Sequence, residues 1–152
     1  MKKNFLLLLM MIFAFVACEG PAGPPGAPGE NGEGANWYIK TFVVEAGEWK
    51  LYADEDGLNP YYMCEKKFSE LDNFIYTDGN VFGYLIQNPG ANSEVQTPLP
   101  FTIPFENTEG ALWHEVVTFD FMPGSVAFYI RYSDFAVDIR PARQEFRVVM
   151  NW

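Results

Sequence analysis

The sequence has little of what most enzymes and metal proteins need. Its 152 residues include one histidine and two cysteines, which argues against a zinc site and against a histidine-based catalytic centre. It contains no Gly-x-Ser-x-Gly elbow, no glycine-rich phosphate loop and no dinucleotide-binding fingerprint. The single histidine, His114, lies within an alternating strand pattern, and we interpret it as a surface or edge-strand residue. We therefore predict a protein that is not an enzyme and that carries no cofactor.

Basic residues are also scarce. The chain has 10 Lys and Arg residues against 20 Asp and Glu residues, a net charge of −10. Proteins that bind nucleic acid need clustered Lys and Arg to neutralise phosphates, so we predict no nucleic-acid partner.

No hydrophobic run is long enough to span a membrane as a helix. The longest, "FLLLLMMIFAFVA" (5–17), has 13 residues, whereas a transmembrane helix needs about 20. Because Lys2 and Lys3 precede this run, residues 1–17 have the charged and apolar regions of a signal peptide. Its removal would lower the count of basic residues from 10 to 8 and leave a net charge of −12.

The end of the apolar run contains a candidate modification site. Residues 15–18, "FVAC", resemble the lipobox of bacterial lipoproteins, which implies that Cys18 is acylated and anchors the chain to a membrane. Several acyl chains would hold the chain firmly, whereas one is marginal. The alternative is an ordinary secretory signal followed by an incidental cysteine. With Cys18 lipidated, Cys64 has no disulfide partner, and we interpret it as a small buried residue.

A collagen-like segment follows the cysteine. Five Gly-X-Y triplets occupy residues 20–34, and their prolines favour a polyproline II backbone that would extend about 45 Å at ~3.1 Å per residue. So few triplets provide few interchain bonds against the entropy of ordering three chains. We therefore predict that residues 18–35 are a lipidated monomeric spacer, with trimerisation through the triplets as the alternative.

From residue 36 onward, short runs of β-branched and aromatic residues alternate with turn residues, which is typical of strands. We predict an all-β domain over 36–152, an antiparallel β-sandwich (Ig-like or jelly-roll-like) of seven to eight strands, with a barrel as the alternative. One short helix is expected at 69–76, capped by Ser69. The strands are expected at 37–44, 49–52, 61–68, 81–87, 112–122, 125–132 and 144–152, with "FTI" (101–103) at a sheet edge because prolines flank it.

The order of these features resembles one protein family. A lipobox cysteine, brief Gly-Pro-rich triplets, an aromatic first strand, "FSELDNFIYTDGNVFGYL" in mid-chain and a terminal "EFRVVM" are similar to the small collagen-like lipoproteins of Bacteroidetes. The resemblance implies a single β-sandwich-like domain on a stalk and a location in the cell envelope. It implies no catalytic residue.

Two groups of residues are candidates for ligand binding. The loop "DEDGLN" places Asp54, Asp56 and Asn59 around a glycine, and oxygen ligands of this kind suit calcium, although a solvated acidic turn is the simpler interpretation. Exposed aromatic side chains favour glycan binding. The candidates for glycan contact are Trp49, Tyr61, Tyr62 and Trp113.

These observations favour a lipid-anchored lipoprotein of the outer membrane or cell surface that displays a non-enzymatic β-sandwich for adhesion, assembly or ligand binding. Its predicted partners are the membrane, through the N-terminal lipid, and an extracellular glycan or protein. A dedicated glycan-binding module is the first alternative. A hydrolase with a carboxylate pair is the second, since 20 acidic residues always include some pairs.

Overall fold

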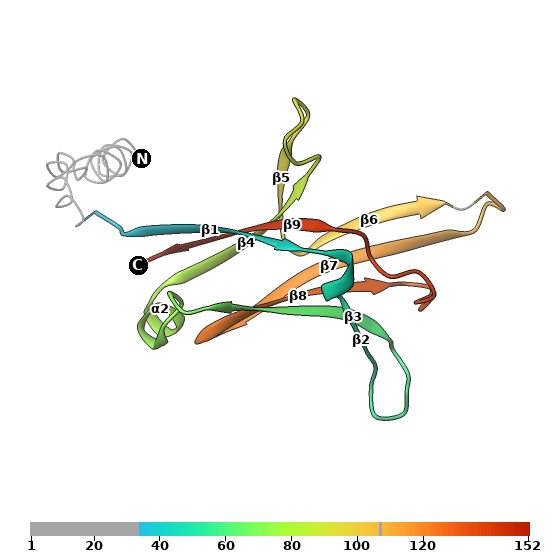
Figure 1. The fold of residues 1–152 in the computed structure, drawn as a ribbon, viewed down its shortest axis with the longest axis horizontal. Helices are drawn as coiled ribbons and strands as arrows, with labels where there is room; N and C mark the ends of the chain where they lie inside the picture. Colours follow the sequence, from blue (N-terminus) through green and yellow to red (C-terminus); the bar gives the residue numbers. More distant parts are fainter. Residues whose placement is uncertain (1–33, 107) are drawn as a thin grey trace, which may run out of the picture. The chain divides into compact units, whose positions relative to one another are not determined.

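The computed structural model describes residues 34–106 and 108–152, which belong to one compact unit with its own core. The predicted leader, Cys18 and the collagen-like triplets up to residue 33 lie outside the described residues. The elements, shown in Figure 1, are β1 (Trp37–Val44), the 3-10 turn η1 (Ala46–Glu48), β2 (Lys50–Tyr52), β3 (Tyr61–Phe68), α2 (Asn73–Asp78), β4 (Asn80–Gln87), β5 (Val95–Pro98), β6 (Phe101–Glu106), β7 (Leu112–Met122), β8 (Gly124–Tyr132) and β9 (Gln144–Asn151).

The strands form two antiparallel sheets. One sheet has four strands in the order β1-β9-β4-β5, and the other has five strands in the order β2-β3-β8-β7-β6. The hairpins β2–β3, β4–β5, β6–β7 and β7–β8 stay within a sheet, whereas the other four connections pass from one sheet to the other. The predicted all-β antiparallel sandwich is confirmed.

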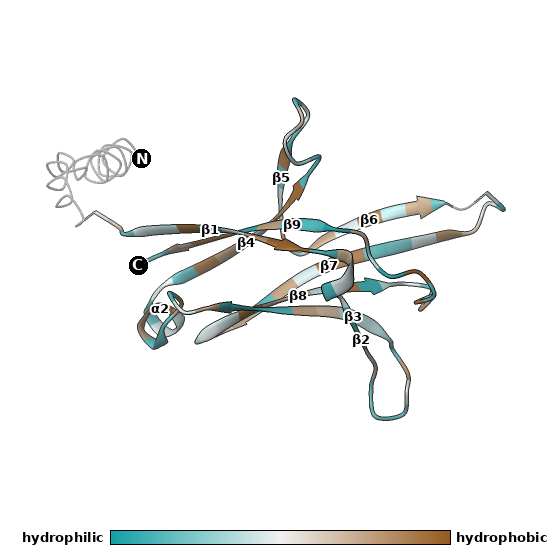
Figure 2. Ribbon diagram, viewed as in Figure 1, coloured by the Kyte–Doolittle hydropathy of each residue, from teal (hydrophilic) through white to brown (hydrophobic). Residues whose placement is uncertain are grey.

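A shared hydrophobic core joins the two sheets. Phe128 of β8 and Phe146 of β9 stack with their ring centroids 4.0 Å apart, and Phe42 of β1 packs edge-on against Phe68 of β3 at 5.2 Å. All four side chains are buried. Because successive strand residues point to opposite faces, hydrophobic and hydrophilic residues are interleaved along both sheets in Figure 2. The inward residues of each strand supply the core.

One strand was not predicted. β5 lies within residues 88–98, where no strand was predicted, and it pairs with β4 at the edge of the four-stranded sheet. It is short and largely exposed, so it has no alternating hydrophobic pattern. The Gln87 side-chain amide donates to the Thr97 hydroxyl at 2.6 Å across this pair. The described residues therefore form nine strands rather than seven or eight.

The helix starts later than predicted. Asp72, not Ser69, is its N-cap, and one carboxylate oxygen accepts the backbone N–H of Ile75 at 2.8 Å. Residues 69–71 instead form a turn that buries Leu71. The helix ends at Asp78, where the N–H of Gly79 donates to the Ile75 carbonyl.

The last strand closes the unit beside the first. β9 pairs with β1 over its whole length, and Asn36 and Trp152 exchange two backbone hydrogen bonds of 2.9 and 3.2 Å. Residue 34, where the collagen-like segment ends, therefore lies at the same end of the sandwich as the C-terminus. The opposite end carries the β6–β7 loop and the β8–β9 connection (133–143), as Figure 1 shows.

Candidate functional site

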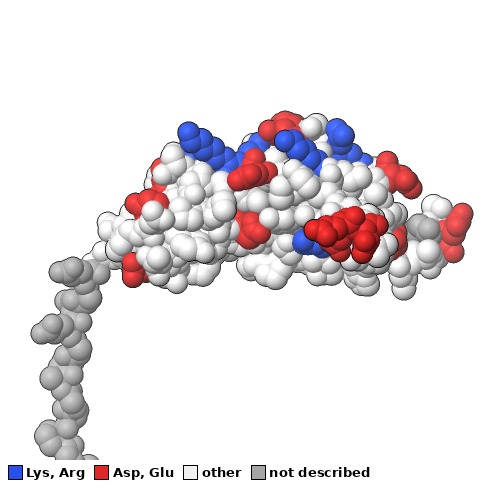
Figure 3. Space-filling model, turned by 90° about the horizontal axis from the view of Figure 1, so that it is seen from below, with Lys and Arg blue, Asp and Glu red and all other residues white. Residues whose placement is uncertain are grey.

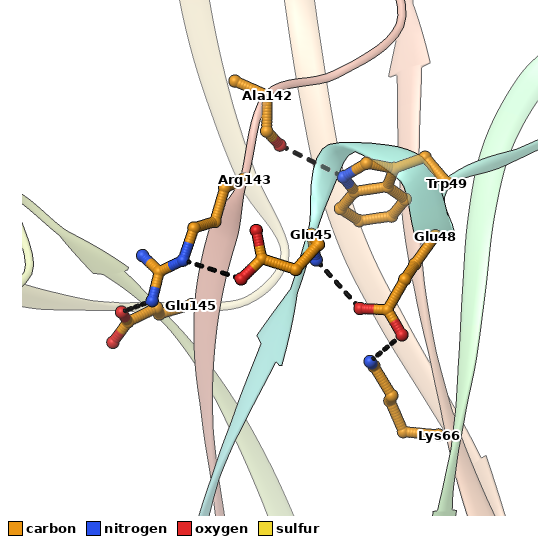
Figure 4. A network of polar contacts seen from close by, with 7 residues as sticks. All are labelled: Glu45, Glu48, Trp49, Lys66, Ala142, Arg143 and Glu145. Carbon is orange, nitrogen blue, oxygen red and sulfur yellow. Dashed lines mark hydrogen bonds and ion pairs between the residues drawn. The ribbon is translucent and has the colours of Figure 1, made fainter.

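Two of the four aromatic residues predicted to contact glycan belong to the core. Trp49 is 1% exposed, and its indole N–H donates to the Ala142 carbonyl at 3.1 Å (Figure 4). It is buried because η1 carries the chain from β1 across to β2 and turns Trp49 inward onto Phe146, at a centroid distance of 6.2 Å. The prediction that Trp49 contacts glycan is wrong.

The ion pairs around η1 hold this crossover in place. Glu48 accepts the backbone N–H of Glu45 at 2.9 Å and pairs with Lys66 of β3 at 2.6 Å. Arg143 pairs with both Glu45 and Glu145. Figure 4 shows these contacts linking η1 to the segment before β9 and to β3. The contacts surround Trp49, whose ring is 1% exposed and therefore closed to a ligand.

Tyr62 is also a core residue. It is 5% exposed, and its hydroxyl donates to the Val137 carbonyl at 2.7 Å. The neighbouring Tyr61 faces the other way, as expected for adjacent strand residues, and is half-buried on the outer face of the five-stranded sheet. The prediction of glycan contact is therefore wrong for Tyr62.

Tyr61 is part of a larger group that the sequence did not reveal. Tyr52 of β2 stacks on Tyr61 with centroids 5.8 Å apart and planes 19° from parallel. Tyr129 of β8 follows at 6.0 Å from Tyr61. We name these three side chains the tyrosine ladder. It crosses three adjacent strands of the five-stranded sheet.

Charged neighbours hold the ladder in place. The Arg131 guanidinium carbon lies 4.8 Å from the centroid of the Tyr61 ring and 5.3 Å from that of Tyr129, within the range of cation–π attraction. The Tyr129 hydroxyl donates to an Asp120 carboxylate oxygen at 2.7 Å. Burial, followed by this hydrogen bond and the Asp120 charge, raises the pKa of Tyr129 to about 12. The phenol is therefore neutral at physiological pH.

Two hollows lie on the same outer face. One, of about 530 Å³, is bordered by Tyr52 and Lys50, and the other, of about 350 Å³, by Tyr129 and Asp120. Both are also lined by Met63, Glu65 and Ser125. They therefore adjoin along β3 and β8, with a ladder tyrosine bordering each. This face offers flat rings and both carboxylate and ammonium groups to a ligand.

Trp113, the fourth predicted residue, lies elsewhere. It is half-buried on the inner face of β7, near the end of the sandwich opposite residue 34. Its ring stacks on Phe105 of β6 at 4.4 Å and meets Tyr132 of β8 nearly at a right angle. Trp113 and Tyr61 therefore do not belong to one site.

The acidic loop predicted as a calcium candidate is a hydrogen-bonded turn. Asn59 directs its side-chain nitrogen, a donor, at an Asp54 carboxylate oxygen 2.6 Å away, and the backbone of Asp54 bonds to Gly57 and Leu58. Asp56 is exposed. Figure 3, which views the side to which the β2–β3 hairpin points, shows a dense group of acidic side chains there. In the described part of the chain, no cluster of three His, Cys, Asp or Glu residues could hold a metal.

Cys64 and His114 do not form a catalytic pair. Cys64 is 5% exposed in the core, and burial raises the pKa of its thiol. His114 is exposed, and it follows the inward-facing Trp113 on β7, so it points to the outer face.

In comparisons with known proteins, no family model, curated protein or solved structure matches the chain. The resemblance to collagen-like lipoproteins therefore stays a prediction. None of the helices within 34–106 and 108–152 has the length and hydrophobicity required to cross a membrane.

Proposed function

We propose that the protein is a lipid-anchored, non-enzymatic binding module that recognises a glycan through the tyrosine ladder. Three tyrosines of different strands, stacked or tilted at 5.8 to 6.0 Å beside two adjoining hollows, are the observation that carries the proposal. Aromatic faces suit the C–H faces of sugar rings, and nearby charged groups suit sugar hydroxyls.

The polar groups around the ladder fit this ligand class. Arg131, Lys50 and Glu65 lie along the ladder and the hollows, and they offer donors and acceptors of both signs. Since a neutral glycan has many hydroxyls and no net charge, such mixed groups suit it better than a surface of one sign.

Binding fits this face better than hydrolysis. Glu65 and Asp120 both pair with Ala127, from opposite sides, so a pair of carboxylates does face the second hollow. A general acid must stay protonated near neutral pH, which usually requires burial. Both carboxylates are exposed, and Asp120 is occupied in holding Tyr129.

The proposed anchor is Cys18, and residues 20–34 act as a monomeric spacer. Residue 34, the last residue of the proposed spacer, lies beside β1 and β9 at one end of the fold. The ladder lies on a strand face of the sandwich rather than at this end.

The anchor is tested by Cys18→Ala, with Cys64→Ala as the matched control. We expect Cys18→Ala to lose an acyl mass and to leave the membrane fraction, whereas Cys64→Ala keeps both. Membrane retention of Cys18→Ala without acylation would refute the lipid anchor. Light scattering of the chain with and without residues 20–34 tests the spacer, and a trimer that becomes a monomer on deletion would contradict it.

The ligand is tested with the unit 34–152, which contains the complete described core, on an array of neutral and charged oligosaccharides. We expect binding to neutral glycans that is lost when Tyr52 and Tyr61 are both changed to Ala. Binding to no glycan, or binding unchanged in the double variant, would refute the ladder as a glycan site without bearing on the anchor.

A further inference from the structure

Another pocket lies at the end of the sandwich opposite residue 34. It has a volume of about 280 Å³ and is lined by Trp113, Tyr132, Asp134, Ala136, Asp138 and Ile139. These residues come from β7, β8 and the β8–β9 connection (133–143). The volume is just below the ~300–1,000 Å³ typical of small-molecule sites, so the pocket suits a small ligand or a single chemical group.

Two aromatic rings form a corner in this pocket. The Trp113 and Tyr132 rings lie 5.5 Å apart with planes at 79°. Each ring is supported from outside the pocket. Phe105 stacks on Trp113 at 4.4 Å and 13°, and Tyr62 packs edge-on against Tyr132 at 6.5 Å. The corner therefore exists before any ligand arrives, which reduces the entropy lost on binding.

The loop that forms the other wall is tied down. At its start, Ser133 and His114 exchange hydrogen bonds of 2.8 and 2.9 Å. In its middle, the Val137 carbonyl accepts the Tyr62 hydroxyl at 2.7 Å. Near its end, the Ala142 carbonyl accepts the Trp49 indole N–H at 3.1 Å. Two buried core residues thus use their polar atoms to fix the position of this wall.

The charged side chains that line the pocket have one sign. Asp134 and Asp138 are the charged side chains among its lining residues, and no described lining residue is Lys or Arg. Glu115, which pairs with Tyr132, lies next to the corner on the same face. Burial and the charges of Glu115 and Asp134 together raise the pKa of Tyr132 to about 12. The aromatic corner therefore lies in a negative field.

The rim is apolar as well as acidic. Ile139 is 82% exposed although it borders the pocket. Exposed apolar groups beside a cavity favour a ligand that buries them. The pocket thus combines aromatic faces, apolar contact and negative charge.

We propose that this pocket binds a small organic cation through a quaternary ammonium group. Aromatic corners attract such cations through the ring quadrupoles, and the attraction grows as the group is desolvated. A quaternary ammonium has no N–H to satisfy, which matches walls that offer ring faces and methyl groups. The two carboxylates at the rim add longer-range attraction. This site is independent of the tyrosine ladder, which lies on the other face of the sheet.

A quaternary ammonium group occurs both in free choline and in the phosphocholine headgroup of lipids. The acidic residues distinguish these sources, because a phosphate beside the ammonium would be repelled by Asp134 and Asp138. We expect the pocket to prefer choline.

The test titrates choline, phosphocholine and 3,3-dimethylbutan-1-ol, the neutral carbon isostere of choline, into the full-length protein in a non-ionic detergent, following the methyl proton signals. We expect saturable choline binding that is about tenfold tighter than binding of the isostere. Equal affinities, absence of saturable choline binding, or phosphocholine binding as tight as choline would overturn the proposal.

Variants locate the binding. Asp134→Asn with Asp138→Asn keeps the side-chain oxygen that accepts the Ala136 N–H at 3.1 Å but removes the charge. We expect choline binding to weaken about five- to tenfold while isostere binding is unchanged. Trp113→Leu should weaken both. The control, Asp54→Asn with Asp56→Asn, makes the same charge change in the β2–β3 loop and should alter neither. Equal effects of the two double variants would overturn the site.

Discussion

The two faces of the five-stranded sheet both carry aromatic side chains, but different interactions hold them. On the inner face, Phe68 and Phe128 are fully buried and pack against rings of the other sheet. On the outer face, Tyr61 and Tyr129 remain partly exposed and are held by stacking, by the Arg131 guanidinium and by Asp120. The inner rings stabilise the fold, whereas the outer rings are ordered and still accessible.

Tyr61 and Tyr62 show the difference within one strand. They are adjacent and chemically identical, yet Tyr62 is 5% exposed and bonded to the β8–β9 connection, whereas Tyr61 belongs to the ladder. The number of aromatic residues therefore does not indicate a binding site in a β-sandwich. Position in the strand alternation, together with the neighbours across strands, does.

The largest expected effect is on stability and concerns the inner face. Phe128→Ala removes a ring that is 0% exposed and stacked on Phe146 at 4.0 Å. A cavity of this kind costs about 3–5 kcal/mol, which we expect to see in the free energy of unfolding measured with urea. Phe82→Ala is the matched control, because Phe82 is 46% exposed. Similar losses for both variants would contradict the division into structural and accessible rings.

The second expected effect is on binding and concerns the outer face. Tyr61→Ala should weaken affinity for the oligosaccharide selected on the array by about tenfold or more. Its free energy of unfolding should change by less than about 1 kcal/mol, since the ring is partly exposed. Tyr84→Ala makes the same change at a half-buried position in the four-stranded sheet and should leave the affinity unchanged. A loss of stability that accounts for the loss of binding would show that the ladder is structural.

The third effect is smaller and separates the ring from its hydroxyl. Tyr129→Phe keeps the ladder but removes the 2.7 Å bond to Asp120, so we expect glycan affinity to fall only about two- to fourfold. The pKa of Tyr129 is raised from 10.0 to about 12. Tyr129 therefore ionises at a lower pH in the unfolded chain than in the folded protein, so the wild type loses stability as the pH rises from 10 towards 12. Urea unfolding over this range should show a shallower loss in Tyr129→Phe, and an unchanged slope would contradict this account.

Much of the fold could be predicted because strand periodicity is a local property. The bounds predicted for β1, β3 and β7 agree with the structure, and the prolines around 101–103 correctly placed β6 at an edge. β5 was missed because a short exposed edge strand carries no alternation. The helix cap was misplaced because Ser69 and Asp72 are both good caps, and only the burial of Leu71 between them favours Asp72.

The candidate site was less predictable because it depends on register. Alternation alone could have placed Tyr129 and Arg131 opposite the buried Phe128, on an outer face. That Tyr52, Tyr61 and Tyr129 form one row depends on which residues pair across strands, and no single strand encodes this. Trp49 was misassigned because a residue after a 3-10 turn follows no strand period.

The smallest expected effect concerns a polar contact between the sheets. Glu70, just after β3, accepts the Tyr38 hydroxyl of β1 at 2.8 Å and pairs with Lys40 at 3.2 Å. The Tyr38 hydrogen bond, followed by backbone, Ser69 and Lys40 contacts, lowers the pKa of Glu70 from 4.5 to about 2. A carboxyl with a lowered folded pKa stabilises the fold above its unfolded pKa, and this contribution is lost as the pH falls through the folded value.

Glu70→Gln should therefore be less stable than the wild type above pH 4.5, and the difference should shrink towards pH 2. The effect is small because the Glu70 side chain is 35% exposed and water screens the pair. Urea unfolding at several pH values measures it, with the exposed loop change Glu55→Gln as control. A difference that stays constant with pH would mean that Glu70 acts through packing. Glu70 would then stabilise the fold as the inner-face rings do, by packing that does not depend on pH.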